Sequence, residues 1–456
     1  MCPAGRRASG GCRTGRVRSP AHTTRLKILK RLGSVQSASP KKHTPHRIGI
    51  HAAAALWAAS FTPHVTSTHQ RLHLQAVGIA ALIASVAVGV LLAWFGRLEQ
   101  RYVHVLAPEL SDLKLQGVAL QKAAFAQEDL LVLYGSSELV KEVPNRATDF
   151  FEEYPTGFRV FPVGKAGTVA LNILQKLAAV GGEMRGRKVA FSLSPSFFFT
   201  DAINADYYEG NFSALHAQEL AYSGLLSREL KRDAARRMRQ YPSTLEDNWT
   251  LAFALDRLAG DSRLDRVLYA TMWPLGQLSN AVGRAQDHVE AGIRIISEGD
   301  EKVVKHPRFA GINWKEVFRR SDEQAKKLVM RPVKLVQRPK GERDASFMAD
   351  VLAADEWDDF ELVLRTLREV GAVPLLLSMP LHGADLEFTG VSAKARHIYG
   401  EKLSALAKRY AMQLVYFEQY EEDPTFFADH QDHPGTKGWV RYNKALDEFY
   451  HNRTDL

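Results

Sequence analysis

Short apolar runs alternate with segments of helical period along most of the chain. Apolar runs bounded by turn residues are typical of strands buried in a parallel sheet, and a helix-period segment after each strand is typical of a crossover helix. The pattern therefore predicts an α/β fold, with a parallel sheet covered by helices on both faces. The predicted strands are 130–134, 158–161, 188–193, 373–378 and 413–417, and the predicted helices are 168–180, 355–369, 394–411 and 439–450.

A long helical insertion is predicted between the third and fourth strands, over about residues 200–350. Segments 220–230, 245–258 and 264–273 have amphipathic helical periods. The insertion also contains four close arginines, which form either a solvated helix face or a patch facing an anionic polymer or lipid. Aromatic residues at its start either pack between insertion and sheet or line a groove for an acyl or polymer substrate. These residues are Arg232, Arg236, Arg237, Arg239, Phe197, Phe198, Phe199, Tyr207, Tyr208 and Phe212.

The N-terminal part of the chain has a different pattern. Residues 76–95 form an uncharged apolar stretch of 20 residues, which matches the length of a helix that crosses a bilayer. A signal peptide is the alternative, but the stretch is longer than a usual signal core and lacks a small-x-small cleavage motif before Arg97. We predict a basic, disordered tail over 1–74, a transmembrane anchor over 75–96 and a polar, partly helical connector over 97–127. An upstream extension from a misassigned start codon would equally account for residues 1–48.

The net charge of +9 is concentrated in the tail. Residues 1–96 contain 13 of the 60 basic residues and no acidic one. The rest of the chain therefore has 47 basic and 51 acidic residues, a net charge of −4. A near-neutral domain argues against nucleic-acid binding. The basic tail favours a cytoplasmic N-terminus, so a single-pass protein of the cell membrane with its large domain outside the cytoplasm is predicted. The cysteines, Cys2 and Cys12, both lie in the tail, so the domain needs no disulfide.

The first predicted strand ends at Gly135-Ser136-Ser137. Open α/β sheets place reactive groups just past the carboxyl ends of their strands, and a glycine permits the sharp turn needed there. A helix is expected to begin after Ser137, and its free N–H groups would stabilise an oxyanion. Ser137 is therefore a candidate nucleophile. Alternatively, Ser136 or Ser137 is only the N-cap of that helix, with Glu138 in its first turn.

A loop rich in histidine and aspartate precedes the last predicted helix, in residues 429–433. If this loop lies over the carboxyl edge of the sheet, His433 reaches Ser137 as a general base, and Asp429 or Asp432 orients the imidazole. A polar surface loop and a metal site are the alternatives. The metal interpretation lacks a third well-spaced set of ligands, so we predict no metal and no cofactor.

Together these features resemble the SGNH-hydrolase superfamily and, more closely, the DltD family of membrane-anchored D-alanyl transfer proteins. The resemblance covers residues from about 75 to 450 and implies a three-layer α/β/α, flavodoxin-like domain over 128–455. It implies Ser137 as nucleophile, His433 as base and Gly164 as an oxyanion donor beside the Ser137 amide, with Gly135 and Ser196 also at oxyanion and substrate-binding positions. The matching segments, besides the anchor, are Gly135-Ser136-Ser137-Glu138-Leu139, Ser192-Leu193-Ser194-Pro195, Met379-Pro380-Leu381-His382-Gly383, Phe388-Thr389-Gly390 and His433-x-Gly435-x-Lys437-Gly438-Trp439.

Two positions depart from the family pattern. The residue three before the catalytic histidine is usually aspartate, but it is His430 here, with acids at Asp429 and Asp432. Asp429 is the favoured partner of His433, because adjacent residues such as Asp432 and His433 point in opposite directions in an extended loop. Ser196 stands where relatives have glutamine after Ser-Pro, which puts a polar substrate contact in doubt.

The expected function is a membrane-anchored extracytoplasmic serine acyltransferase or esterase. The resemblance implies D-alanine as the acyl group, a carrier-protein thioester and a membrane O-acyltransferase as upstream partners, and an envelope glycopolymer or lipid as acceptor. Two alternatives remain open on the residues alone. One is an O-acetyltransferase that modifies a polysaccharide, and the other is a non-catalytic scaffold that binds a carrier protein or polymer.

Overall fold

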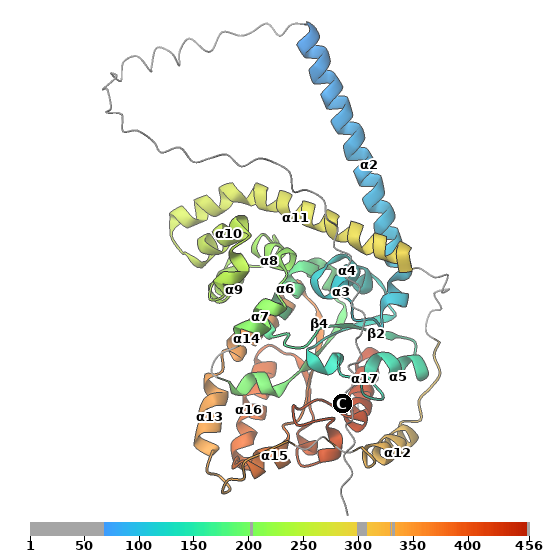
Figure 1. Cartoon of the computed structure of the whole chain (residues 1–456), viewed down its shortest axis with the longest axis vertical. Coiled ribbons are helices and arrows are strands. Elements are labelled where there is room, and N and C mark those ends of the chain that lie inside the picture. The colour runs from blue at the N-terminus through green and yellow to red at the C-terminus, as the bar shows by residue number, and fades with distance from the viewer. Residues whose placement is uncertain (1–67, 201–203, 299–307, 329, 331–332, 454–456) are drawn as a thin grey trace, which may run out of the picture. The chain divides into compact units, whose positions relative to one another are not determined.

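A computed structural model describes residues 68–453, apart from 201–203, 299–307, 329 and 331–332 (Figure 1). The predicted disordered tail lies, for residues 1–67, outside the described residues. The strands are β1 Leu130–Tyr134, β2 Arg159–Val163, β3 Lys188–Leu193, β4 Val373–Ser378 and β5 Gln413–Tyr416. The helices are α2 Thr68–Leu106, α3 Asp112–Gln116, α4 Ala119–Ala126, α5 Ala147–Glu153, α6 Ala170–Val180, α7 Ala205–Gly210, α8 Ala214–Ala221, α9 Arg228–Met238, α10 Trp249–Ala259, α11 Arg263–Glu298, α12 Trp314–Ala325, α13 Asp344–Ala353, α14 Glu356–Val370, α15 Gly383–Phe388, α16 Ala393–Arg409 and α17 Thr436–Tyr450.

The five strands form one parallel sheet in the order β2-β1-β3-β4-β5. This is the flavodoxin-like order, in which the chain reverses its direction of winding between β1 and β3. Val132 in β1 lies opposite Phe161 in β2 and Val189 in β3, so the three strands are in close register. The predicted α/β class with a parallel sheet is confirmed. Ligands of such sheets bind beyond the carboxyl ends of the strands at this reversal.

Both faces of the sheet are buried, as the apolar strand sequences require. Alternate residues of β1 point to opposite faces: Val132 joins the larger core and Leu131 the smaller one. The larger core packs α4, α6, α14 and α16 on one face, and the smaller core packs α5 and α17 on the other (Figure 1). The result is the three-layer α/β/α arrangement.

Two helix predictions were wrong. Ser137–Leu139 forms only a single 3₁₀ turn, and the next helix begins at Ala147. Pro144 disfavours helical geometry before it, and Asn145 adopts a positive φ of 66°. Segment 220–230 is also not one helix, because α8 ends at Ala221 and α9 begins after the N-cap Ser227, whose side chain accepts a hydrogen bond from the Leu230 N–H.

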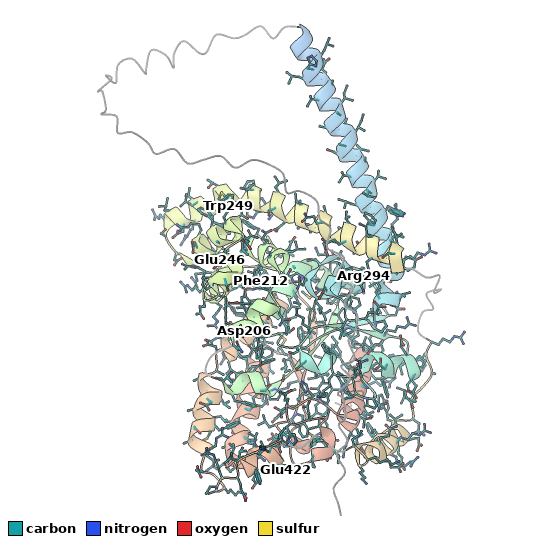
Figure 2. The ribbon with its side chains drawn as sticks, in the orientation of Figure 1. Asp206, Phe212, Glu246, Trp249, Arg294 and Glu422 are labelled. Atoms are coloured by element: carbon teal, nitrogen blue, oxygen red, sulfur yellow. The ribbon has the colours of Figure 1, made fainter. Side chains whose placement is uncertain are left out.

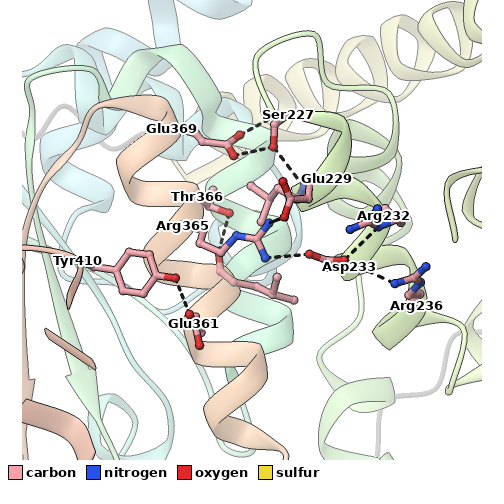
Figure 3. A network of polar contacts seen from close by, with 12 residues as sticks. Ser227, Glu229, Arg232, Asp233, Arg236, Glu361, Arg365, Thr366, Glu369 and Tyr410 are labelled. Atoms are coloured by element: carbon pink, nitrogen blue, oxygen red, sulfur yellow. Dashed lines mark hydrogen bonds and ion pairs between the residues drawn. The ribbon is translucent and has the colours of Figure 1, made fainter. Parts of the chain in front are cut away.

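The helices between β3 and β4 are joined to the sheet-covering helix α14 by polar contacts (Figure 3). The Ser227 hydroxyl and N–H both donate to Glu369, at 2.7 Å each, and Arg365 pairs with Asp233 at 2.9 Å. Arg237 forms a bidentate pair with the buried Asp359. The other three arginines of the group seen in the sequence, Arg232, Arg236 and Arg239, pair with Asp233 or Asp256. Acidic side chains therefore neutralise the arginine patch.

One helix within the described residues is long and apolar enough to cross a membrane, namely residues Leu72–Leu106 of α2. It contains the uncharged stretch 76–95 and continues beyond it. This helix fits a single-pass membrane protein.

A buried histidine on α8 predicts a specific pH dependence of stability. His216 is 1% exposed, and its Nε2 lies 3.0 Å from the Gly117 carbonyl oxygen, to which it donates in the neutral form. Burial, with a further contribution from Lys176, lowers its pKa from 6.5 to about 3. Below pH 6.5 the unfolded chain therefore binds a proton that the folded protein does not, so stability falls with falling pH.

Between pH 7 and pH 5, protonation of this histidine in the unfolded chain should lower the free energy of unfolding by about 2 kcal/mol. We expect His216→Gln to remove that share of the loss, measured by chemical unfolding of the full chain in detergent at both pH values. His397→Gln is the contrasting variant: the hydrogen bond with Glu418 raises the pKa of this exposed histidine, so its replacement should not reduce the loss of stability at low pH. An equal pH dependence in wild type and His216→Gln would contradict the assignment.

Candidate active site

The turn after β1 presents Ser137 at the reversal point of the sheet. Gly135 N–H donates to the Val163 carbonyl oxygen at 3.2 Å, which extends the β1–β2 pairing by one residue. Ser136 and Ser137 then turn away from the sheet. Ser136 is the N-cap of the 3₁₀ turn but makes no side-chain cap hydrogen bond. Its hydroxyl is instead 3.4 Å from the Lys165 carbonyl oxygen, so the alternative in which these serines serve only as caps is not supported.

The loop before α17 is closed on itself. Ala428 N–H donates to the His433 carbonyl oxygen at 2.8 Å, and Phe427 and Pro434 form an isolated antiparallel bridge. Gly435 N–H donates to the Phe426 carbonyl oxygen, also at 2.8 Å. These bonds hold both ends of the loop and so fix Asp429 and His433 relative to each other.

Three side chains from opposite ends of the domain meet in this region. His433 Nε2 lies 2.7 Å from Ser137 Oγ, and His433 Nδ1 lies 2.8 and 2.9 Å from the two carboxylate oxygens of Asp429. A carboxylate can only accept, so Nδ1 carries the proton of the neutral ring. Nε2 is then the acceptor for the Ser137 hydroxyl. This tautomer is the one that a histidine base requires.

Asp429 is held as a carboxylate. Burial opposes its ionisation, but hydrogen bonds from His433, Lys141 and the Gln431 N–H outweigh burial and lower its pKa below the usual value. Lys141 belongs to the turn that carries Ser137, because its N–H donates to the Ser137 carbonyl oxygen at 3.1 Å. Sequence analysis missed this lysine. Its position four residues after the serine was the available signal.

Asp432 lies apart from the imidazole. It adopts a positive φ of 59°, and its Oδ1 accepts a hydrogen bond from the His382 N–H at 3.0 Å. Aspartate tolerates this left-handed conformation better than most residues. Burial raises the pKa of Asp432 to about 7 despite that hydrogen bond. The structure therefore brings Asp429, and not Asp432, to the His433 ring.

Ser137 and His433 open into a cleft of about 870 Å³. Phe197, Phe199 and Tyr207 line one part of it. Phe198 instead packs inward on Trp357 and Tyr399, so the aromatic cluster serves both the groove and the core. The other lining residues are Ala166, Gly167, Ser194, Ser196, Thr200, Asn204, Leu335, Arg343, His382, Asp385, Leu386, Thr389, His430, Gln431 and Asp432.

The remaining predicted site residues lie on the loops after β1, β2 and β3. Ser196 lines the cleft, with its hydroxyl 3.0 Å from that of Ser194. Gly135 and Gly164 pack against each other, and a Cβ at Gly164 would overlap the Gly135 carbonyl oxygen. Neither glycine is among the residues that line the cleft. Gly164 therefore sets the path of the backbone immediately before the two serines.

One group in the described part of the chain has the spacing of metal ligands. His382, Asp385 and His430 each offer a ligand atom within 4.8 Å of the others. His430 Nδ1 also forms a hydrogen bond with Asp385, and this bond accounts for the closeness of these two residues. The prediction that the site holds no metal stays a prediction.

These features define a three-layer α/β protein with a serine, a histidine and an aspartate joined at one cleft. The model of the DltD family, described as DltD protein, matches residues 107–451. The chain belongs to the DltD family, so the resemblance seen in the sequence is confirmed.

Curated relatives of the same name match over most of their length. The chain is 25% identical over 388 residues to Protein DltD of Bacillus subtilis (strain 168), which covers 82% of this chain and 95% of the relative. It is 24% identical over 374 residues to Protein DltD of Staphylococcus aureus (strain NCTC 8325 / PS 47), and this match covers 78% of the chain and 90% of the relative. The chain is 23% identical over 384 residues to Protein DltD of Lacticaseibacillus rhamnosus, and this match covers 81% of the chain and 89% of the relative.

Proposed function

We propose that this chain is a membrane-anchored, extracytoplasmic serine acyltransferase or esterase that transfers D-alanyl groups to an envelope polymer. The observation that carries the proposal is the 2.7 Å contact between Ser137 Oγ and His433 Nε2, with Asp429 on the other ring nitrogen. Membership of the DltD family supports D-alanine as the acyl group. The candidate span in α2 supports the anchor, and the basic tail favours a cytoplasmic N-terminus.

The first half of the reaction forms an acyl-enzyme. Ser137 Oγ attacks the carbonyl carbon of the acyl donor while His433 Nε2 takes the hydroxyl proton. Asp429 stabilises the imidazolium so formed. The family resemblance assigns the backbone N–H groups of Ser137 and Gly164 as donors to the tetrahedral oxyanion. The bond to the leaving thiol or alcohol then breaks, and the leaving group takes the proton from His433.

The second half returns the serine. A hydroxyl of the acceptor polymer attacks the acyl carbon of the Ser137 ester while His433 accepts its proton. The second tetrahedral intermediate collapses, the bond to Ser137 Oγ breaks, and His433 returns the proton to that oxygen. Water in place of the hydroxyl gives hydrolysis. The carrier-protein thioester and the membrane O-acyltransferase are proposed as upstream partners from the family resemblance.

Ester analysis of the envelope polymers tests the function. We expect a strain that lacks the gene to lose polymer-bound D-alanine, measured by mass spectrometry, and the wild-type chain to restore it. Loss of O-acetyl groups instead would favour the polysaccharide O-acetyltransferase. Restoration by Ser137→Ala as well as by wild type would contradict catalysis and favour the scaffold.

Gly164→Ala tests the backbone before the nucleophile. The new Cβ would displace the Gly135 carbonyl and with it the following serines. A displacement of about 1 Å at a reacting group can cost about 10²-fold in rate, so we expect a loss of this order in labelling by a serine-directed probe. Gly224→Ala is the control, because a Cβ there meets nothing within 4 Å. Wild-type labelling of Gly164→Ala would contradict the tight packing.

A further inference from the structure

The long helix α11, whose ribbon is seen in Figure 1, exposes an apolar stripe. Its positions follow steps of three, four or eleven residues and so fall on one helical face. Aliphatic side chains on this face are more than half exposed. They are Leu264 at 64%, Val267 at 59%, Leu278 at 61%, Val282 at 53%, Ile293 at 58% and Ile296 at 55%. A continuous exposed apolar face of this length marks an interaction surface.

The opposite face of α11 is buried, and polar groups make several of its contacts. Asp287 accepts hydrogen bonds from the N–H groups of Val118 and Ala119, both at 2.7 Å, at the start of α4. Arg284 pairs with Glu219 of α8, and Asn280 is fully buried. The helix thus buries these polar groups together with Tyr269, Ala291 and Ile295, while its aliphatic stripe points outward. A helix on a water-soluble domain usually buries such a stripe. These contacts prevent α11 from rotating to bury the stripe.

The C-terminal part of α11 packs on α2 at the end of the uncharged stretch. A Cβ at Gly292 would overlap the Phe95 ring, so the two helices are in close contact there. Four residues further along α2, Glu99 pairs with His288 at 2.8 Å. Phe95 is the last residue of the apolar stretch 76–95. The C-terminal end of the stripe, near Ile293, therefore lies at the depth where a membrane-spanning α2 would leave the hydrocarbon region.

A groove lined by both apolar and polar residues adjoins the stripe. Leu275, Leu278 and Val282 of α11 line it together with Trp249, which is 65% exposed at the start of α10 (Figure 2). Tryptophan is enriched where a membrane meets water. The aliphatic side chains of α11 that are more than half exposed all lie on one face, a pattern typical of a helix that lies in the membrane surface and does not cross it.

We propose that the α11 stripe docks on the membrane surface, with its aliphatic side chains in the phospholipid acyl region. The occupant is the lipid bilayer itself. α2 and α11 then form two attachments, one across the membrane and one along it. This inference concerns how the domain is held and goes beyond the acyl-transfer activity.

Depth-dependent fluorescence quenching tests the docking. The full chain, with Cys2 and Cys12 replaced by serine, is reconstituted in vesicles of phosphatidylcholine and phosphatidylglycerol. A fluorophore is attached in separate variants to Leu278→Cys, Val282→Cys or Ile293→Cys. We expect lipids with a nitroxide on the acyl chain to quench these labels several-fold more than labels at Glu323→Cys and Glu401→Cys, which are exposed sites on other helices.

Aqueous iodide should give the opposite order, with strong quenching of the control labels and weak quenching of the stripe labels. A label at Val86→Cys inside the apolar stretch reports insertion of α2 independently. Stripe labels that iodide reaches as easily as the controls, while the Val86 label is protected, would overturn the docking. That outcome would leave the stripe for an apolar protein partner, and the proposed acyl transfer would be unaffected.

Discussion

Ser137→Ala is expected to abolish labelling by an active-site serine probe and to lower acyl-transfer turnover by at least about 10³-fold, the scale on which serine enzymes lose activity without their nucleophile. The reason is chemical: position 137 would hold no oxygen for the acyl carbon, while His433 Nε2 would keep its place 2.7 Å from the vacated position. Stoichiometric labelling of the wild-type chain, read by intact-protein mass spectrometry, is the measurement.

A second serine serves as control. Ser346→Ala removes an exposed hydroxyl on α13 that donates only to the Arg343 carbonyl oxygen, so both labelling and the thermal midpoint should match wild type. The thermal midpoint of Ser137→Ala should also stay close to wild type, which separates loss of chemistry from loss of fold. No labelling of the wild-type chain would favour a scaffold. Wild-type labelling of Ser137→Ala would show that another group reacts and would end the assignment of Ser137 as nucleophile.

Replacing the two loop aspartates singly is expected to have very unequal effects. Asp429→Asn removes the carboxylate that selects the Nδ1–H tautomer of His433 and stabilises its protonated form, so a loss of about 10³- to 10⁴-fold in kcat/KM is expected. Asp432→Asn should cost no more than about tenfold, because its oxygen accepts from the His382 backbone and an amide oxygen can do the same. Rates of probe labelling and of ester turnover measure both.

The Asp432→Asn variant should also differ from wild type in how its stability depends on pH. Because burial raises the pKa of Asp432 to about 7, the folded protein disfavours its ionised form above the unfolded pKa of about 3.9, and the cost grows until pH 7. Asp432→Asn should therefore be at least as stable as wild type at pH 8 in chemical unfolding. Equal, mild activity losses for Asp429→Asn and Asp432→Asn would end the assignment of a serine–histidine–aspartate triad.

Local sequence predicted the strands well and their spatial order not at all. Three strands match their predicted bounds, 130–134, 188–193 and 373–378, because strands buried on both faces are largely apolar. The helix after Ser137 was wrong, since Pro144 and the tertiary contacts of the turn outweigh the apolar spacing of Leu139, Val140 and Val143. The reach of α11 to Glu298 was also missed, because aliphatic residues such as Leu278 and Ile293 are exposed while Asn280 and Asp287 are buried.

The amino-acid sequence by itself determined the α/β class, the apolar stretch 76–95, the family and the residue types available for acyl transfer, because these follow from local composition and order. Only the tertiary structure decided which groups meet. The strand order places the loops after β1 and β5 over one cleft, the left-handed turn at Asp432 directs that carboxylate to His382, and Lys141 reaches Asp429 across 288 residues. Such contacts depend on how separate elements pack, which no local pattern encodes.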